Sequence, residues 1–206
     1  MTCEGSSRAS DPRRAHSRLG RIGLTAVALA AGLCSGACEL DDLDLTLAAP
    51  STTSGYVVGV ALDHGEGALY VCGTTDATRA DSAWFRVDGA RRVVDTHGVE
   101  RGSITIGDHV TGTISIGGQE VPFDLDARAD VGLVLDGFDS GCRTGVVTFR
   151  GDDGLETAGT WCSASGQVEQ VTPITPIQDA AAGLWVRIGV EPNRELLVRP
   201  VRATLR

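Results

Sequence analysis

The chain has 206 residues and a net charge of −9, and 42% of its residues are hydrophobic. The acidic balance excludes a nucleic-acid binder, because such proteins need a basic surface to neutralise phosphates. The hydrophobic content excludes a globally disordered chain. All 18 basic residues are arginine, a bias that a GC-rich coding sequence produces without any selection for function.

The first 37 residues have the organisation of an export signal. Five arginines between Arg8 and Arg21 precede an uncharged apolar run, Ile22 to Leu33, and small residues follow it. The run is too short to span a bilayer as a helix, which takes about 20 residues. A basic segment, a short apolar segment and small residues are typical of a secretory signal peptide. We therefore predict that residues 1–37 are removed on export.

The end of this leader is similar to a bacterial lipoprotein signal. Ser35, Gly36 and Ala37 lead directly into Cys38, although the family usually has leucine where this chain has Ser35. The resemblance implies that Cys38 becomes the lipid-modified N-terminus and anchors the protein in the cell envelope, outside the cytoplasm. The alternative is an ordinary signal peptide, which would give a secreted protein with an unmodified Cys38.

Cleavage before Cys38 leaves 169 residues with 13 arginines against 25 acidic residues, a net charge of −12. Such a surface repels anionic lipid headgroups, so membrane attachment would come from the lipid and not from a basic patch. Residues 38–54 combine an acidic cluster, Asp41 to Asp44, with the polar stretch Pro50 to Ser54. This composition predicts a flexible tether over 38–54.

From residue 55 to residue 206 the hydrophobic pattern has a period of two, which predicts one all-β domain. The clearest block is Ser103 to Asp126, where alternating apolar residues are interrupted at Gly107-Asp108 and Gly117-Gly118. Two-residue breaks with glycine between alternating segments indicate consecutive hairpins, whose turns require positive φ.

Further strand-like runs recur every eight to twelve residues: Tyr56–Leu62, Leu69–Cys72, Ala83–Val87, Val131–Leu135, Thr144–Phe149, Thr157–Cys162, Val168–Pro173, Leu184–Val190 and Glu195–Val201. This spacing predicts an antiparallel meander of seven to ten strands that forms a sandwich or a partly closed barrel. The only helical expectation after the leader is a short turn at Ile177–Ala182.

Three cysteines belong to the predicted domain, in an oxidising compartment where disulfides persist. Cys142 and Cys162 stand at the ends of adjacent strand-like segments, so we predict a disulfide between them. Cys72 lies in an apolar run and is interpreted as a small buried hydrophobe, with a Cys38–Cys72 bridge as an alternative if Cys38 carries no lipid. No CxxC or HxxxH spacing occurs, so we expect neither zinc nor another cofactor.

Four short motifs resemble an uncharacterised group of exported bacterial β-domains: YVCG at 70–73, GCRTG at 141–145, GTWC at 159–162 and QVTPI at 170–174. The similarity would extend over roughly residues 55–200. It implies a folded extracellular module and no established chemistry.

Candidate catalytic and metal-binding residues have simpler structural interpretations. Asp139-Ser140-Gly141 resembles the nucleophile loop of chymotrypsin-like proteases, but Phe138 and Cys142 replace its flanking glycines, and we interpret it as a turn. Histidines near acids are interpreted as solvated loop residues and not as metal ligands: His64 with Glu66, His97 with Glu100, and His109 after Asp108. The acidic turns Asp136–Asp139 and Asp152-Asp153 could hold calcium weakly, and we interpret them as solvated turn carboxylates. The tripeptide Arg150-Gly151-Asp152 matches an integrin-recognition sequence, and we interpret it as part of the same turn. Trp84, Trp161 and Trp185 fall in strand-like runs, and we interpret them as core or inter-sheet packing in preference to a sugar platform.

These observations predict an envelope-associated lipoprotein whose β-domain has a non-catalytic binding or structural role toward a protein or glycan partner. Two alternatives stay open: an exported hydrolase with an unidentified carboxylate pair, and a secreted inhibitor-type binder. A pocket with two carboxylates of raised pKa would favour the enzyme, and an exposed apolar patch would favour a binder.

Overall fold

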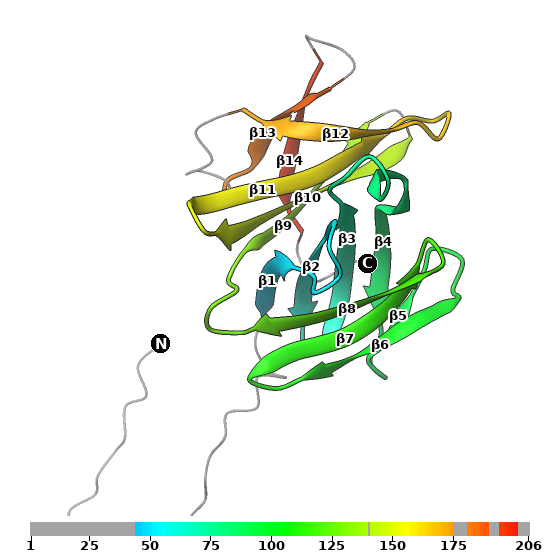
Figure 1. Ribbon diagram of the computed structural model, residues 1–206, viewed down its shortest axis with the longest axis vertical. Coiled ribbons are helices and arrows are strands. Elements are labelled where there is room, and N and C mark those ends of the chain that lie inside the picture. Colours follow the sequence, from blue (N-terminus) through cyan, green and yellow to red (C-terminus); the bar gives the residue numbers. More distant parts are fainter. Residues whose placement is uncertain (1–43, 140, 175–180, 190–193, 202–206) are drawn as a thin grey trace, which may run out of the picture. The chain divides into compact units, whose positions relative to one another are not determined.

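The computed structural model describes residues 44–139, 141–174, 181–189 and 194–201. This part of the chain is all-β and antiparallel, as the sequence predicts, with fourteen strands and one short 3₁₀ helix, η2 (Arg79–Asp81). The strands form two successive assemblies (Figure 1). Within the described residues, no helix has the length and apolar character needed to cross a membrane.

The first assembly is an eight-stranded meander in which each strand pairs with the next along the chain. Its strands are β1 (Leu45–Pro50), β2 (Tyr56–Asp63), β3 (Glu66–Gly73), β4 (Ala83–Val87), β5 (Arg92–Val94), β6 (Glu100–Ile106), β7 (His109–Ile116) and β8 (Gln119–Asp126). The sheet curls so that its two ends approach each other: the Ser51 hydroxyl, just after β1, donates a 2.6 Å hydrogen bond to the carbonyl of Pro122 in β8.

The second assembly is a closed six-stranded barrel with the strand order β10-β11-β12-β13-β14-β9. Its strands are β9 (Leu133–Asp139), β10 (Cys142–Gly151), β11 (Gly154–Cys162), β12 (Val168–Pro173), β13 (Leu184–Ile188) and β14 (Glu195–Pro200). Closure occurs where β14 pairs with β9, with Arg199 opposite Asp136. Closing the sheet removes the free edges that an open sheet would expose.

Three hydrophobic clusters stabilise these assemblies, and β2 shows how the sequence builds two of them. Alternate residues of β2, including Val58, Val60 and Leu62, lie in the cluster enclosed by β1–β8. The intervening residues Val57 and Ala61 lie in a second cluster, which packs the outer face of β1–β3 against β9–β11. The strand is therefore buried on both faces, and its successive side chains point to opposite sides as strand geometry requires. The third cluster fills the six-stranded barrel.

Two glycines let the assemblies approach each other closely. A Cβ on Gly59 of β2 would overlap the side chain of Val147 in β10, and a Cβ on Gly145 of β10 would overlap the ring of Tyr70 in β3. Neither glycine has a positive φ, so their function is to provide space rather than an unusual backbone conformation.

The structure corrects three expectations. The predicted tether 38–54 is wrong from residue 45, because Leu45–Pro50 form β1, in which Leu47, Ala48 and Ala49 are buried. The described part contains fourteen strands instead of seven to ten. The chain forms two assemblies instead of one, and the sequence pattern predicted neither β1 nor the three-residue β5. At the predicted hairpin turns, Gly117 and Gly118 have the expected positive φ, but Gly107 does not. Most of the helical turn expected at 177–182 lies outside the described residues.

Candidate functional site

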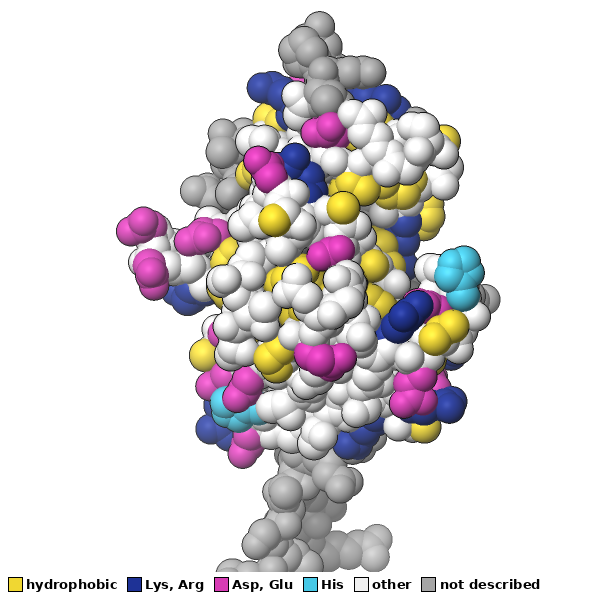
Figure 2. Space-filling model, turned by 45° about the vertical axis from the view of Figure 1, so that its right-hand side comes forward, with side chains coloured by type: hydrophobic (Ala, Val, Ile, Leu, Met, Phe, Trp, Pro, Cys, Tyr) yellow, Lys and Arg dark blue, Asp and Glu magenta, His cyan; other side chains and the backbone are white. Residues whose placement is uncertain are grey.

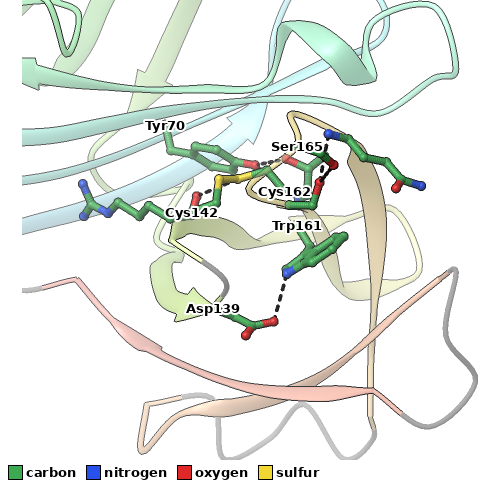
Figure 3. Close-up of a disulfide and its surroundings, with 10 residues drawn as sticks. Tyr70, Asp139, Cys142, Trp161, Cys162 and Ser165 are labelled. Carbon is green, nitrogen blue, oxygen red and sulfur yellow. Dashed lines mark hydrogen bonds between the residues drawn. A yellow bond between two sulfur atoms is a disulfide. The ribbon is translucent and has the colours of Figure 1, made fainter.

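The predicted disulfide is present in the structure. Cys142 begins β10 and Cys162 ends β11, the two strands are paired, and the Cα atoms lie 5.7 Å apart. Figure 3 shows the bridge beside Tyr70, at the side of the barrel that meets the eight-stranded sheet. The crosslink therefore fixes β10 to β11 close to the contact between the two assemblies.

The remaining cysteine of the described residues, Cys72, is a free thiol and fully buried. Burial raises the pKa of this thiol to about 12, so it stays protonated and is a poor nucleophile. This environment agrees with the interpretation of Cys72 as a small buried hydrophobe. Cys38, the predicted lipidation site, lies outside the described residues.

Asp139 makes polar contacts with two neighbouring side chains, Trp161 and Arg194. Its Oδ2 accepts a 3.3 Å hydrogen bond from the Trp161 indole (Figure 3) and pairs with Arg194, whose guanidinium lies 4.8 Å from the centre of the Trp161 ring. Ser140, the predicted turn residue, lies outside the described residues, and Gly141 has a φ of +80°. Positive φ at this glycine agrees with a turn between β9 and β10.

The histidine and acidic candidates are dispersed over the surface, and no group of three potential metal ligands gathers among the described residues. His109 corrects the loop interpretation, because it is the first residue of β7. Its ring lies 2.6 Å from a carboxylate oxygen of Asp124 on β8, and this hydrogen bond raises the pKa of His109. The turn carboxylates Asp152 and Asp153 are exposed at the tip of the β10–β11 hairpin, beside the exposed Arg150.

The three tryptophans have different environments. Trp161 is buried inside the barrel, and Trp84 packs between the two assemblies 4.7 Å from the ring of Tyr70. Both agree with the packing interpretation. Trp185 does not: it is 51% exposed. Its neighbours Leu184 and Val186 point into the barrel, so the alternation of the strand turns Trp185 outward.

Trp185 belongs to a row of apolar side chains across the outer wall of the barrel. Trp185 of β13 lies opposite Leu197 of β14. β14 pairs with β9 through Arg199 opposite Asp136, and Leu197 and Phe138 each stand two residues away from this pair, on the same side of their strands. Phe138 is 72% exposed. We call Phe138, Leu197 and Trp185 the outer row.

Arg143 lies between the outer row and Trp84 of the eight-stranded sheet. Arg143 lies opposite Phe138 on the neighbouring strand β10, and its guanidinium stacks over the Trp84 ring, 3.7 Å from the ring centre. The Arg143 Nε donates a 2.9 Å hydrogen bond to Asp136, which fixes the side chain in this position. A hollow of about 360 Å³ begins at this point; it is lined by Trp84, Phe85, Arg86, Asp95, Thr96, Gly98 and Arg143.

Charged residues surround the outer row in mixed signs. Arg187 pairs with Glu195, while the exposed Arg199 has no carboxylate at salt-bridge distance among the residues the structure describes. Figure 2 shows hydrophobic, acidic and arginine side chains intermingled on the face that it presents. The outer row is therefore a strip of apolar side chains bordered by charged side chains.

Sequence reasoning identified the disulfide and the burial of Cys72 but not the outer row. The residues of the outer row are far apart in the chain. The sequence contained a sign of only one of them, because Trp185 alternates with Leu184 and Val186 in a predicted strand and so points to the opposite face. No family model, curated protein or solved structure matches this chain.

Proposed function

We propose that this protein is an exported, lipid-anchored protein of the cell envelope and that its β-domain is a non-catalytic binding module. In this proposal the outer row of Phe138, Leu197 and Trp185 is the surface that contacts a protein partner. The observation that carries the proposal is that Trp185 and Phe138 are 51% and 72% exposed, with Trp185 opposite Leu197 on the outer wall of the barrel.

The chemistry of the row suits a protein partner. Tryptophan and arginine are enriched among the interface residues that dominate binding energy, because they combine a large apolar surface with directed polar contacts. Burying apolar side chains contributes about 25 cal/mol per Å² of surface removed from water. The exposed Arg199 adds a positive charge at the rim. We therefore expect a partner that offers an apolar cleft bordered by carboxylates.

The barrel wall is a rigid platform for such a contact. The residues beneath the row, including Leu184, Val186 and Val198, are buried inside a closed barrel, and the Cys142–Cys162 disulfide joins two of its strands. A preformed surface loses little conformational entropy on binding. A disulfide of this kind also persists in the oxidising compartment to which the leader would direct the chain.

A photo-reactive amino acid introduced at position 185 in cells tests the binding surface. We expect irradiation to give a discrete adduct with one envelope protein from position 185 and also from position 138. Leu155, which is 50% exposed on the β10–β11 hairpin, is the matched control and should not give this adduct. No adduct at 185 and 138, or the same adduct from 155, would contradict the proposal. An adduct that disappears after glycosidase treatment would identify a glycan partner instead.

The lipid anchor requires a separate experiment, because it can fail while the binding surface stands. Mass spectrometry of the exported protein should show an N-terminal Cys38 carrying acyl chains, and Cys38→Ser should release the protein from the membrane fraction. An unmodified N-terminus at or before Cys38 would overturn the anchor and favour the secreted form.

No observation favours the hydrolase alternative over this proposal. A carboxyl that acts as a proton donor at neutral pH needs a raised pKa. In this structure hydrogen bonds from Arg92, from the Val99 amide and from the Arg128 amide lower the pKa values of Asp88, Asp95 and Asp126 respectively, so these three carboxyls are unsuited to that role.

A further inference from the structure

The tip of the β10–β11 hairpin extends past the residues that pair with the neighbouring strands (Figure 1). The pairing of β10 with β9 ends at Thr148, and β12 pairs with β11 only over Thr160–Cys162. Residues 150–156 therefore form a two-stranded ribbon, which is exposed at every position except the half-buried Gly151. Exposed connections held by a rigid scaffold are frequent positions of binding residues, so we asked what this tip presents.

The ribbon ends in the tripeptide Arg150-Gly151-Asp152. Arg150 is the next-to-last residue of β10, and Asp152 and Asp153 form the two-residue turn that leads into β11. Neither turn residue has a positive φ, whereas Gly154 has a φ of +129°, a conformation that glycine adopts without strain. The shape of the turn therefore depends on Gly154, and the charged side chains of the tripeptide are not needed to form it.

The two charged side chains of the tripeptide are available to a partner. Arg150 and Asp152 are both exposed, and neither makes a side-chain hydrogen bond or an ion pair with another of the described residues. The Glu156 carboxylate on the facing strand reaches Gly151, but it makes no ion pair with Arg150 among the residues that the structure describes. The tip therefore presents an unpaired guanidinium and an unpaired carboxylate, separated by a residue without a side chain.

The chemistry of these groups defines a complementary site. Carboxylates bind a guanidinium through charge-assisted hydrogen bonds, and a carboxylate oxygen is a preferred ligand of Mg²⁺ and Ca²⁺. The tip is negative overall, with Asp152, Asp153 and Glu156 against Arg150, and so attracts a cation. We propose that the tip is a second binding site and that its partner is a cell-adhesion receptor of the integrin class. Such a receptor selects this tripeptide, binding the carboxylate on a divalent cation and the guanidinium beside its own carboxylates.

Binding of the purified exported protein to a purified integrin tests the proposal. The probe is the vitronectin receptor, and surface plasmon resonance measures its binding to the immobilised protein. We expect saturable binding in buffers that contain magnesium or manganese, loss of binding in EDTA, and competition by the synthetic peptide Gly-Arg-Gly-Asp-Ser. An absence of saturable binding with either cation, or binding that persists in EDTA, would leave a solvated hairpin tip only and overturn the proposal.

Matched variants locate the contact. Asp152→Glu keeps the charge but moves the carboxylate by one methylene away from the cation, so it should weaken binding by about tenfold or more. Asp153→Glu makes the same change one residue later and should retain binding. Arg150→Gln should also weaken binding by about tenfold or more, since a hydrogen bond between charged groups contributes enough for this change. Equal effects of Asp152→Glu and Asp153→Glu, on variants with unchanged thermal unfolding, would contradict the assignment. Trp185→Ala, in the outer row, should leave this binding unchanged, so the two binding sites can be tested separately.

Discussion

The hydroxyl of Tyr70 lies 2.8 Å from the hydroxyl of Thr160 and accepts a 3.2 Å hydrogen bond from the Thr160 backbone N–H. Tyr70 belongs to β3 of the eight-stranded sheet and Thr160 to β11 of the barrel, 90 residues later. Both are buried, so this polar contact joins the two assemblies inside an otherwise apolar cluster. Buried hydrogen bonds of this kind specify one relative arrangement, because any displacement leaves polar atoms unpaired.

Tyr70→Phe should therefore destabilise the protein. The substitution keeps the ring but removes the partner of the Thr160 hydroxyl, and an unpaired buried polar group costs about 1–3 kcal/mol. Urea unfolding of the two proteins measures the difference. A Tyr70→Phe variant as stable as the parent protein would show that this hydrogen bond does not hold the assemblies together.

Gly145→Ala should be more disruptive than its single added methyl group suggests. The new Cβ would overlap the Tyr70 ring, and overpacking of a core costs about 1–3 kcal/mol. Gly107→Ala is the matched control, because its Cβ would meet only the His109 carbonyl at 3.9 Å, and we expect a change within about 0.5 kcal/mol. Thermal unfolding should show a larger loss of stability for Gly145→Ala than for Gly107→Ala. Equal losses of stability would contradict the close approach at Gly145.

The disulfide and the buried thiol predict a specific labelling pattern. In the folded protein Cys72 should resist alkylation, and unfolding without reductant should expose Cys72 while Cys142 and Cys162 remain protected. Replacing both bridge cysteines by serine should lower the free energy of unfolding by about 3 kcal/mol, because the bridge closes a loop of 20 residues. Labelling of Cys142 or Cys162 before reduction would rule out the bridge.

Both tyrosines of the chain should titrate abnormally in the folded state. Desolvation, aided by the hydrogen bond to Asp81, raises the pKa of Tyr56 to about 12, and burial raises the pKa of Tyr70 well above its usual value. An unfolded chain loses these protons near pH 10, so stability should fall as the pH rises from about 10 to 12. Tyrosinate absorbance should stay low until the protein unfolds. Absorbance that rises near pH 10, with the circular dichroism unchanged, would contradict the burial of both rings.

His109 should contribute stability that is lost at a lower pH than that of the tyrosines. Its hydrogen bond to Asp124 raises its pKa, so the contribution is complete below the unfolded pKa of about 6.5 and is lost as the pH rises through the folded pKa. Asp124→Asn should shift the His109 titration to lower pH in a nuclear magnetic resonance experiment, while the His97 signals serve as the control. The effect on stability should be small, because the pair is exposed. An unchanged His109 titration would refute the contact.

The alternation of apolar and polar residues and the glycines of the turns were sufficient to predict much of the β-structure. The alternation from Ser103 to Asp126 predicted β6, β7 and β8, and the positive φ of Gly117 and Gly118 fits the turn that joins the last two. The Cys142–Cys162 bridge was predictable because paired antiparallel strands bring their ends together. β1 was missed because a six-residue strand between acidic and Ser-Thr-rich segments resembles part of a tether.

Only the tertiary structure decided what lies against each strand face. The sequence shows that Trp185 and Val57 point away from their neighbours, yet Val57 is buried against the barrel and Trp185 is half exposed. Alternation fixes two opposite faces for every strand, but whether a face is covered depends on contacts between residues far apart in the chain. The same limit applies to Trp84 and Arg143, which come from different assemblies and line one hollow. Periodicity is a local property, whereas coverage and cavities arise from packing.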